Sequence, residues 1–590
     1  MQAGNLHTTI KICFLGYLHN IDRRKTMYRV ENPSVLPWYE KVTEDYPKAR
    51  YYCDSIEEVQ IEMRDGIKLN TRIFRPNRKE PFNVLFTRNP YPANEKAYEA
   101  LYLPFVEQGY CLIIQDCRGT GKSEGKWEPF THERDDGIDA LTWIQNQEWI
   151  KTVGTFGRSY SAFTQWIVGD LLPSKVKTMI LEVFGIDRYN QVYSNGMFRE
   201  DIYTSWAFAN SGVKSNLSTA NQYQIALKHS PANSRDLKIL NQSLPFYQDY
   251  LCETNPNSDY WKNSIWETLI EIPEKINVPV LVTDGWADHH LQGSLDGFRR
   301  LRPEIRKQSR IIVTPTDHIG NLTGSLNYPN SERFGFMNMR ANLDWFNHMV
   351  KGNKDIFDSS FYLMRKGLWL DPEMRNITSY KLNFSSIDSL SERNGKPGQT
   401  HFISDPTIPN TWPGGNELLA WITPGFTNQP HGFTNALPYS KTNQSIRFES
   451  DNFKKNEVFI GETTIGLMVA SSATDTAFAV RLCEHTAEGY YINIKDGISS
   501  LSGRNNNYEQ AYKPGTRVKL TINLGDIAWE IKEGSSLVVL VASGNFPMYA
   551  IHSNHAGQWS HQTLRKTIAQ QTVFVGKGGS FLNLPLVVKQ

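Results

Sequence analysis

The stretch Val153-Gly154-Thr155-Phe156-Gly157-Arg158-Ser159-Tyr160-Ser161-Ala162 decides the fold of this chain, because a short apolar run passes into a helical pattern through a sharp turn. Ser159 stands at the apex of that turn. A serine on a tight strand-to-helix turn presents its hydroxyl above the sheet, and backbone N–H groups point to the same place. The turn needs small neighbours, which Gly157, Ser161 and Ala162 supply. The stretch predicts such an elbow, although the last glycine of the G-x-S-x-G pattern is missing and an ordinary turn before a helix is the alternative.

Continuous apolar runs on both sides of the elbow are typical of strands that are buried on both faces of a sheet. These runs occupy residues 83–87, 110–115, 153–156, 177–183, 279–283 and 310–314. Helical patterns at 136–147 and 163–172 lie between several of them, and period-two alternation at 59–63 and 67–73 predicts an antiparallel hairpin ahead of them. Strands that alternate with helices form mostly parallel, doubly wound sheets, so the predicted fold class is α/β.

Two intervals break this alternation. Between Val183 and Pro279 the chain is rich in aromatic and polar residues, with helical stretches at 199–210 and 221–229. This interval predicts a helical cap over the sheet, and a separate small domain is the alternative. After about Gly352, short alternating segments separated by Gly, Asn and Pro predict an all-β sandwich. The segments that show this alternation best are 463–470, 477–483, 517–523 and 536–542.

The predicted organisation has four parts, because a chain of 590 residues is too long for one hydrophobic core. They are an N-terminal extension over 1–26, an α/β domain over 27–184 and 276–351, a helical cap over 185–275, and a β-sandwich over 352–590. The extension fits poorly with the α/β pattern of the domain after it, and Met27 is a plausible alternative start.

Composition argues against several classes of partner and site. The 63 basic and 61 acidic residues give a formal net charge of +2, so neither a nucleic acid nor a membrane surface is expected as a partner. Six cysteines are scattered without a C-x-x-C pair, which argues against a zinc ribbon, a redox motif and a disulfide framework. Free, mostly buried thiols and a cytoplasmic location are expected. The apolar run at 12–18 is too short to span a bilayer.

A serine at an elbow needs a base that removes its proton, and the base needs a carboxylate that holds its tautomer. Asp288 follows the apolar run at 279–283, and His318 follows the run at 310–314. Both lie just past the carboxyl end of a predicted strand, which is the edge where open parallel sheets bind ligands. The order Ser159, Asp288, His318 is that of the α/β-hydrolase fold.

Neighbouring residues offer alternatives within both turns. Asp284 precedes the chosen aspartate, Asp317 precedes the chosen histidine, and His289 and His290 follow the aspartate directly. The two adjacent histidines suggest metal ligands, but no second cluster with ligand spacing accompanies them. We therefore expect no metal and no cofactor.

Further blocks surround these candidates. In the α/β part they are Arg88-Asn89-Pro90-Tyr91, Gln115-Asp116-Cys117-Arg118-Gly119, Ser123-Glu124-Gly125, Asp135-Asp136-Gly137-Ile138-Asp139, Trp143-Ile144 and Gly285-Trp286-Ala287-Asp288. In the sandwich they are Ala470-Ser471-Ser472-Ala473-Thr474-Asp475-Thr476-Ala477-Phe478, Asp496-Gly497-Ile498 and Ser543-Gly544-Asn545-Phe546-Pro547. In order and extent, from about Tyr39 to about Asn554, they resemble the cocaine esterase-like (CocE/NonD) hydrolases. These are relatives of X-Pro dipeptidyl peptidases, α-amino acid ester hydrolases and glutaryl-cephalosporin acylases. The chain departs from the family at Ala162, where a glycine is common.

The resemblance implies an α/β-hydrolase domain with a helical cap insertion, followed by an all-β jelly-roll sandwich. It implies Ser159 as the nucleophile, His318 as the general base and later the acid, and Asp288 as the residue that orients the imidazole. The phenolic O–H of Tyr91 would bind the oxyanion together with the backbone N–H of Tyr160. A donor of this kind is worth about 3 kcal/mol when it is removed from other enzymes. The alternative for Tyr91 is a core aromatic at a strand end.

These residues predict a serine hydrolase that transfers an acyl group from a small-molecule ester or amide to water through an acyl-enzyme. Ester cleavage and acylase activity rank above X-Pro dipeptidyl peptidase activity, and a non-enzymatic carbohydrate-binding protein is the alternative from another class. A homo-oligomer is a possible assembly.

Candidates for substrate contacts are fewer. Trp166, Trp206 and Trp286 are candidates for an apolar acyl pocket, with ordinary core packing as the alternative. A peptidase would need carboxylates that bind a free amino terminus. The candidates in or near the predicted cap are Glu200, Asp201 and Glu267.

Overall fold

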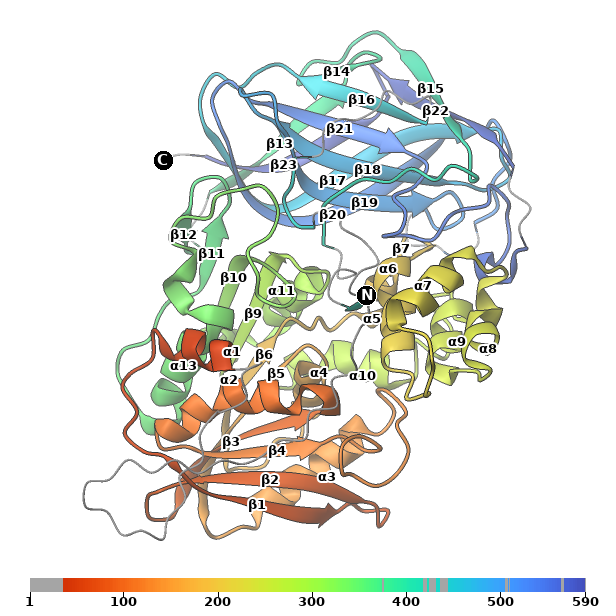
Figure 1. Cartoon of the computed structure of the whole chain (residues 1–590). Coiled ribbons are helices and arrows are strands. Elements are labelled where there is room, and N and C mark those ends of the chain that lie inside the picture. Colours follow the sequence, from red (N-terminus) through yellow and green to blue (C-terminus); the bar gives the residue numbers. More distant parts are fainter. Residues whose placement is uncertain are drawn as a thin grey trace, which may run out of the picture. The chain divides into compact units, whose positions relative to one another are not determined.

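The structure is a computed structural model. It describes residues 36–373, 376–416, 422–423, 431–435, 444–504, 508, 510–563 and 567–588. The predicted N-terminal extension (1–26) and the alternative start at Met27 lie outside these residues. The chain, which Figure 1 colours by residue number, divides into two compact units. The first comprises Met1–Leu181, Asn277–Leu281 and Glu332–Phe357, and the second comprises Glu182–Ile276, Val282–Ser331 and Asp358–Gln590. The predicted domain boundaries divide the chain differently and stay a prediction.

The first unit contains a sheet with the strand order β1-β2-β4-β3-β5-β6. The strands are β1 (Cys53–Glu62), β2 (Lys68–Pro76), β3 (Phe82–Asn89), β4 (Cys111–Asp116), β5 (Ile150–Arg158) and β6 (Val176–Glu182). β1 and β2 are antiparallel, with Ile61 opposite Leu69, so the predicted hairpin is confirmed. β3 is parallel to both β4 and β5. The carboxyl ends of these three strands therefore share one edge of the sheet.

Several α-helices lie in the described residues of the first unit. They are α1 (Leu36–Thr43), α2 (Glu95–Glu107), α3 (Glu133–Gln145), α4 (Tyr160–Trp166) and α13 (Met339–Lys351). The ring of Phe346 on α13 lies 5.8 Å from that of Phe105 on α2 and 6.1 Å from that of Phe156 on β5. Gly154 makes this approach possible, because a Cβ there would lie 2.6 Å from the Phe346 ring. The aromatic core thus fixes the strand that leads into the elbow.

Helix α4 is shorter than the sequence predicted. The helical pattern at 163–172 predicted a helix to residue 172, and this prediction was wrong because α4 ends at Trp166. The chain continues in tighter turns, such as the hydrogen bond from the Gly169 N–H to the Trp166 carbonyl. Glycine is a weak helix former, and Pro173 disfavours a helical conformation in the residue before it. Of the predicted helix over 163–172, only residues 163–166 are α-helical.

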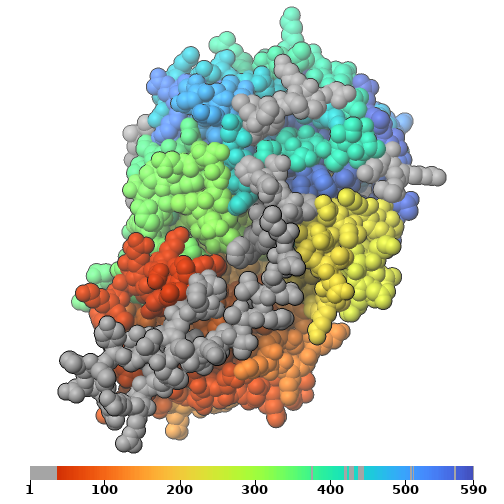
Figure 2. Space-filling model, viewed as in Figure 1, coloured from red at the N-terminus to blue at the C-terminus, as the bar shows by residue number. Residues whose placement is uncertain are grey.

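The interval 185–275 is helical, as predicted, and belongs to the second unit. Its helices are α5 (Arg188–Val192), α6 (Glu200–Ala209), α7 (Thr219–Lys228), α8 (Arg235–Leu240), α9 (Pro245–Cys252) and α10 (Ile265–Glu271), and a small hairpin joins β7 (Tyr193–Ser194) to β8 (Met197–Phe198). Much of this segment appears as one continuous yellow surface in Figure 2. Within the segment, Leu217, Ile225 and Leu237 are exposed, while Tyr247 and Tyr250 are buried.

The second unit also contains the strands that precede the two other candidate residues. In order they are β9 (Val280–Ala287), β10 (Arg310–Asp317), β11 (Ser360–Leu363) and β12 (Leu368–Leu370), accompanied by α11 (Leu291–Arg300) and α12 (Pro303–Arg306). Every residue of β9 is buried, as the continuous apolar run predicted. Asp288 is the first residue after β9, and His318 is the first residue after β10.

The rest of the second unit is an all-β sandwich, drawn in green to blue in Figure 1. Its strands are β13 (Ile377–Phe384), β14 (Ser389–Ser391), β15 (Gly398–Ser404), β16 (Ser445–Ser450), β17 (Glu457–Ser471), β18 (Ala477–His485), β19 (Tyr491–Ser500), β20 (Val518–Ile531), β21 (Ser536–Ala542), β22 (Ala569–Val575) and β23 (Phe581–Val587). The order is β15-β22-β17-β23-β13-β14-β16-β21-β18-β19, and β20 pairs with β17. The four predicted alternating segments fall on β17, β18, β20 and β21, which confirms the prediction of an all-β part.

Two further expectations concern the described residues only. Four of the five described cysteines are buried, as predicted, and none of the five is in a disulfide. Within the described parts of the chain, no helix is both long and apolar enough to cross a membrane.

Candidate active site

Ser159 lies between β5 and α4 with φ 56° and ψ −128°. Few residues other than glycine adopt a positive φ, and such strain costs about 1–3 kcal/mol at functional sites. Gly157 is required for the turn, because a Cβ there would lie 2.0 Å from the carbonyl oxygen of Ser161. Ala162 donates its N–H to the Ser159 carbonyl at 2.8 Å and is fully buried, so its methyl group fits where the family commonly has glycine. The sequence-predicted elbow therefore forms.

Tyr160, the first residue of α4, is anchored by a buried polar network. Its phenolic O–H donates to Oε1 of Glu133 at 2.9 Å, and the same phenolic oxygen accepts the N–H of Phe130 at 2.7 Å. Oε2 of Glu133 lies 2.7 Å from Nη1 of Arg88. Burial, with the nearby Glu133 carboxylate, raises the pKa of Tyr160 well above its usual value, so the phenol stays protonated. The network fixes the residue whose backbone N–H starts the helix.

Tyr91 is the second residue after β3, which is the parallel neighbour of β5. Its backbone N–H donates to Oδ1 of Asn89 at 3.0 Å, which shapes the turn. Its ring packs edge-on against that of Tyr160, with the ring centroids 6.3 Å apart. The structure thus brings Tyr91 alongside the residue that follows Ser159, although these positions lie far apart in the sequence.

Asp288 and His318 form a buried pair in the second unit. Oδ2 of Asp288 lies 2.8 Å from Nδ1 of His318, and Oδ1 of Asp288 accepts the backbone N–H of His290 at 2.8 Å. A carboxylate on Nδ1 keeps the ring proton there and directs the other nitrogen toward acid–base chemistry. The pair has the geometry of a base and its orienting carboxylate.

The alternatives within both turns have other partners. Oδ1 of Asp284 accepts the N–H of Gly285 at 2.7 Å. Oδ1 of Asp317 accepts the N–H groups of Ile319 and Asn321, and its Oδ2 lies 3.2 Å from Nε2 of His431. Among these three aspartates, Asp288 is the one that binds the imidazole of His318.

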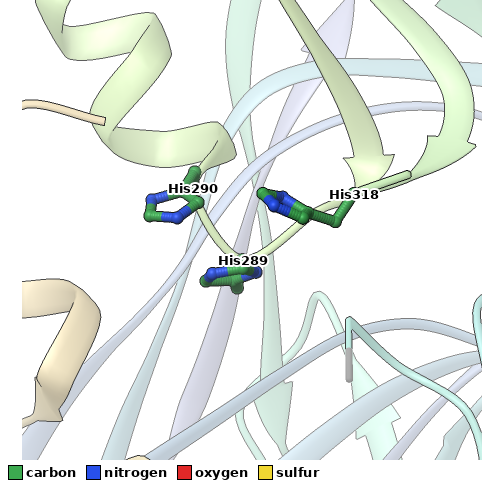
Figure 3. Close-up of side chains that lie close together, drawn as sticks. All are labelled: His289, His290 and His318. Carbon is green, nitrogen blue, oxygen red and sulfur yellow. The ribbon is translucent and has the colours of Figure 1, made fainter. Parts of the chain in front are cut away.

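His289 and His290 lie beside this pair (Figure 3). The His289 ring centroid is 4.0 Å from that of His290 and 4.9 Å from that of His318. Burial, with the charges of neighbouring histidines and arginines, lowers the pKa of both His289 and His290 well below the usual value. Both rings are therefore neutral near pH 7.

A cavity of about 100 Å³ adjoins the pair within the second unit. Trp286, Asp288 and His289 line it on one side, and Lys495 lines it from β19. Trp286 is buried and donates its indole N–H to the Tyr362 carbonyl at 2.8 Å. Burial lowers the pKa of Lys495 to about 8, against the opposing pull of the surrounding aspartates.

The other candidates for substrate contacts are buried or bound to other residues. Trp166 is fully buried on α4. Glu200 is bound by Arg235 through two hydrogen bonds of 2.9 Å, and Asp201 by Arg199 at 2.6 and 3.0 Å. Oε2 of the third carboxylate, Glu267, accepts the N–H of Asn263 at 2.9 Å. Trp206 packs edge-on against Phe246, with centroids 5.8 Å apart.

The predicted site residues therefore gather in two sets. Ser159, Tyr91 and Tyr160 lie together in the first unit. Asp288 and His318 lie together in the second, with Trp286 on the neighbouring cavity. Sequence reasoning missed Glu133, which holds the phenol of Tyr160. The available signal was its place two residues before the quoted Asp135-Asp136 block.

Two family models and a curated relative match this chain. The family model of the X-Pro dipeptidyl-peptidase (S15 family) matches residues 65–320, and that of the X-Pro dipeptidyl-peptidase C-terminal non-catalytic domain matches residues 373–578. A cocaine esterase of Rhodococcus sp. (strain MB1 Bresler) is 24% identical over 558 residues, which cover 86% of this chain and 94% of that protein.

Solved structures agree on the fold. An aminopeptidase from a marine sediment Thaumarchaeota archaeon superimposes with a TM-score of 0.80 at 17% identity, covering 92% of this chain and 98% of that chain. An α-amino acid ester hydrolase superimposes with a TM-score of 0.75 at 19% identity, covering 90% of this chain and 96% of that chain. The predicted fold class, an α/β-hydrolase domain with a helical cap insertion followed by a jelly-roll sandwich, is confirmed.

Proposed function

This chain belongs to the cocaine esterase-like (CocE/NonD) hydrolases, which are related to the X-Pro dipeptidyl peptidases, and it is a serine hydrolase; on that premise we propose that Ser159, His318 and Asp288 are its catalytic triad. The observation that carries the proposal is the strained backbone of Ser159 on an elbow that tolerates no side chain at Gly157. Strain at a buried turn persists where the surrounding structure enforces it, and it clusters at active sites.

In the proposed reaction, the imidazole of His318 removes the proton from Oγ of Ser159 as Oγ attacks the substrate carbonyl. The backbone N–H of Tyr160 and the phenolic O–H of Tyr91 bind the oxyanion that develops. The protonated imidazole, held by Asp288, then gives its proton to the leaving alcohol or amine, which leaves an acyl-enzyme. Water activated by the same imidazole releases the acid and restores Ser159.

We propose small-molecule carboxylic esters or amides as substrates, ahead of X-Pro peptides. Two similar proteins are named for ester cleavage, the cocaine esterase and the α-amino acid ester hydrolase, whereas another is named an aminopeptidase. Two of the three carboxylates that were candidates for binding a free amino terminus are already paired, Glu200 with Arg235 and Asp201 with Arg199. Each of these two would have to leave its arginine to bind a substrate amine, which disfavours the peptidase.

A cytoplasmic location is part of the proposal, supported by the five described cysteines, none of which is in a disulfide.

The test compares initial rates of the full chain and its Ser159→Ala variant on short-chain esters, aromatic esters, a glutaryl amide and an X-Pro amide. We expect ester turnover to fall on the order of a million-fold in the variant, by analogy with other triads, with thermal unfolding unchanged. A variant that turns over esters at a near wild-type rate would refute the triad. A wild-type preference for the X-Pro amide would move the substrate class to peptides.

A further inference from the structure

Three histidines gather at the carboxyl ends of β9 and β10. His289 lies in the turn after β9, His290 caps the start of α11, and His318 follows β10. Figure 3 shows the three imidazoles clustered around one point. One ring nitrogen of each lies within 4.8 Å of the others. In the described part of the chain, no other group of three or more histidine, cysteine or acidic side chains comes so close together.

One buried ring nitrogen of the cluster is open to a metal ion, which binds an imidazole through an unprotonated nitrogen. Nδ1 of His289 is buried and has no hydrogen-bond partner among the described residues. The side chain of His289 is 5% exposed, so a polar nitrogen without a partner is costly there. An ion would supply the missing partner.

The carboxylate of Asp288 lies beside the three histidines and supports metal binding by them. Metal-bound histidines commonly donate their second ring N–H to a carboxylate, which fixes the ring and raises the basicity of the ligand nitrogen. Asp288 has this relation to Nδ1 of His318 at 2.8 Å. Its Oδ1 also lies 3.3 Å from Nδ1 of His289, without the geometry of a hydrogen bond. The carboxylate also offsets part of the positive charge of a divalent ion.

The three imidazoles must move closer together to bind one ion. A tetrahedral zinc ion with bonds of about 2.1 Å places its ligand nitrogens about 3.4 Å apart, so the rings must close by roughly 1.4 Å at most. His290 must also give up the hydrogen bond from the Gly185 N–H to its Nδ1, because a neutral imidazole has one ring nitrogen that accepts. That bond is 3.4 Å long, outside the usual range, and its loss costs little.

The cavity described above gives an ion a route to the cluster, since His289 and Asp288 line its wall. We propose that His289, His290 and His318 bind a transition-metal ion that favours imidazole ligands, such as Zn²⁺ or Cu²⁺. We also propose that the bound ion inhibits the enzyme, because it takes the nitrogen of His318 that does not bind Asp288. The inhibition rests on the proposed function, whereas the binding does not. The ion takes no part in the reaction.

The binding test uses the full chain freed of metal with EDTA and then desalted. Calorimetric titration with ZnCl₂ should show one ion per chain, and His289→Gln and His290→Gln should each weaken its binding on the order of tenfold or more. The matched control is His348→Gln on α13, which should leave the affinity unchanged. Equal affinity in all four proteins, or no binding to the wild type, would overturn the proposal.

A second measurement keeps the test decisive if a histidine variant does not fold. The electron paramagnetic resonance spectrum of the wild type with one equivalent of CuCl₂ should show coupling to several imidazole nitrogens. A spectrum without nitrogen coupling would contradict a histidine site.

Measurements of ester turnover with and without zinc distinguish the metal proposal from the proposed hydrolase function. ZnCl₂ should inhibit ester turnover at concentrations that match its affinity, EDTA should restore the rate, and the two glutamine variants should resist inhibition relative to their own metal-free rates. Zinc that binds at the cluster without inhibiting would refute the inhibitory role. A metal-free wild type without ester turnover would refute the proposed function and leave the binding result intact.

Discussion

Asp288 holds His318 through a 2.8 Å hydrogen bond between Oδ2 and Nδ1, and both side chains are buried. The second oxygen of the carboxylate is fixed as well, because it accepts the backbone N–H of His290. A carboxylate held at both oxygens cannot rotate away, so the imidazole keeps one tautomer and one orientation. The sequence order alone suggested Asp288, and this contact supports its role as the residue that orients His318.

Replacing Asp288 by asparagine tests that role. The asparagine can donate to Nδ1 of His318 through its amide and would then favour the wrong tautomer, with Nδ1 unprotonated. We expect kcat for an ester to fall about 10⁴-fold in Asp288→Asn, as in another triad with this change. The measurement is kcat at pH 7 to 8, together with thermal unfolding.

The matched control is Asp317→Asn, because Asp317 was the alternative carboxylate next to His318. The amide oxygen of asparagine still accepts the N–H groups of Ile319 and Asn321, so the turn should survive. A loss of kcat in Asp317→Asn as large as that in Asp288→Asn would contradict the assignment of the orienting carboxylate.

Tyr91→Phe tests the proposed oxyanion donor. The change removes the phenolic O–H and keeps the ring that packs on Tyr160. We expect kcat to fall about 10²- to 10³-fold with little change in KM, because the donor acts on the oxyanion that forms in the transition state. Steady-state kinetics on one ester check this. A Tyr91→Phe enzyme with unchanged kcat would favour the alternative that Tyr91 is a core aromatic.

Tyr160→Phe tests the buried network behind the elbow. The change leaves the Phe130 N–H and the carboxylate of Glu133 without the phenolic oxygen, and a buried group that loses its partner costs about 1–3 kcal/mol. Urea unfolding should show this loss of stability. Tyr490→Phe is the control, because Tyr490 is 52% exposed and should change stability little. Equal stabilities of the two variants would mean that the network contributes nothing.

The strain at Ser159 predicts the relative stability of two inactive variants. Glycine adopts a positive φ without the penalty that a Cβ brings, whereas alanine keeps that penalty. Ser159→Gly should therefore be more stable than Ser159→Ala by about 1 kcal/mol, although glycine also has the more flexible unfolded chain. Chemical denaturation of both proteins measures the difference. An alanine variant more stable than the glycine variant would show that the elbow is not strained.

Local sequence signals predicted much of this fold, because they depend on residues close in the chain. The elbow was predictable from Gly157 and the small residues after Ser159, and the buried strands from their continuous apolar runs. The length of α4 was not, because a helical pattern continues to residue 172 while Gly169 and Pro173 end the helix early.

Contacts between distant segments carried no such signal. Glu133 accepts a hydrogen bond from Tyr160 because α3 and α4 lie side by side, and the sequence spacing of the two residues does not predict this contact. His318 joins His289 and His290 only because β10 and β9 end at the same edge. The expectation of no metal rested on the lack of a second cluster with ligand spacing in the sequence, and a third ring from a separate strand leaves no such spacing.

Lys495→Met should stabilise the protein at pH 7, with a gain that depends on pH. The lysine lines the cavity, and the aspartates that surround it, Asp284, Asp288, Asp496 and Asp526, do not fully offset the burial that lowers its pKa from 10.5 to about 8. Below pH 8 the folded protein bears the full cost of a charged, partly desolvated ammonium. That cost is about 3 kcal/mol at most, since each pKa unit is worth about 1.4 kcal/mol and any solvent screening reduces it.

The sign of the pH dependence follows from proton binding. Between pH 8 and 10.5 the unfolded chain keeps the lysine proton that the folded protein has lost, so the wild type gains stability as the pH rises. The advantage of Lys495→Met should therefore be greatest at and below pH 8 and shrink toward pH 10. Unfolding free energies at pH 7, 8, 9 and 10 measure it, with Lys519→Met on the exposed face of β20 as the control. An advantage that stays constant across this range, or a destabilised variant at pH 7, would show that the ammonium of Lys495 is fully compensated by the aspartates around it.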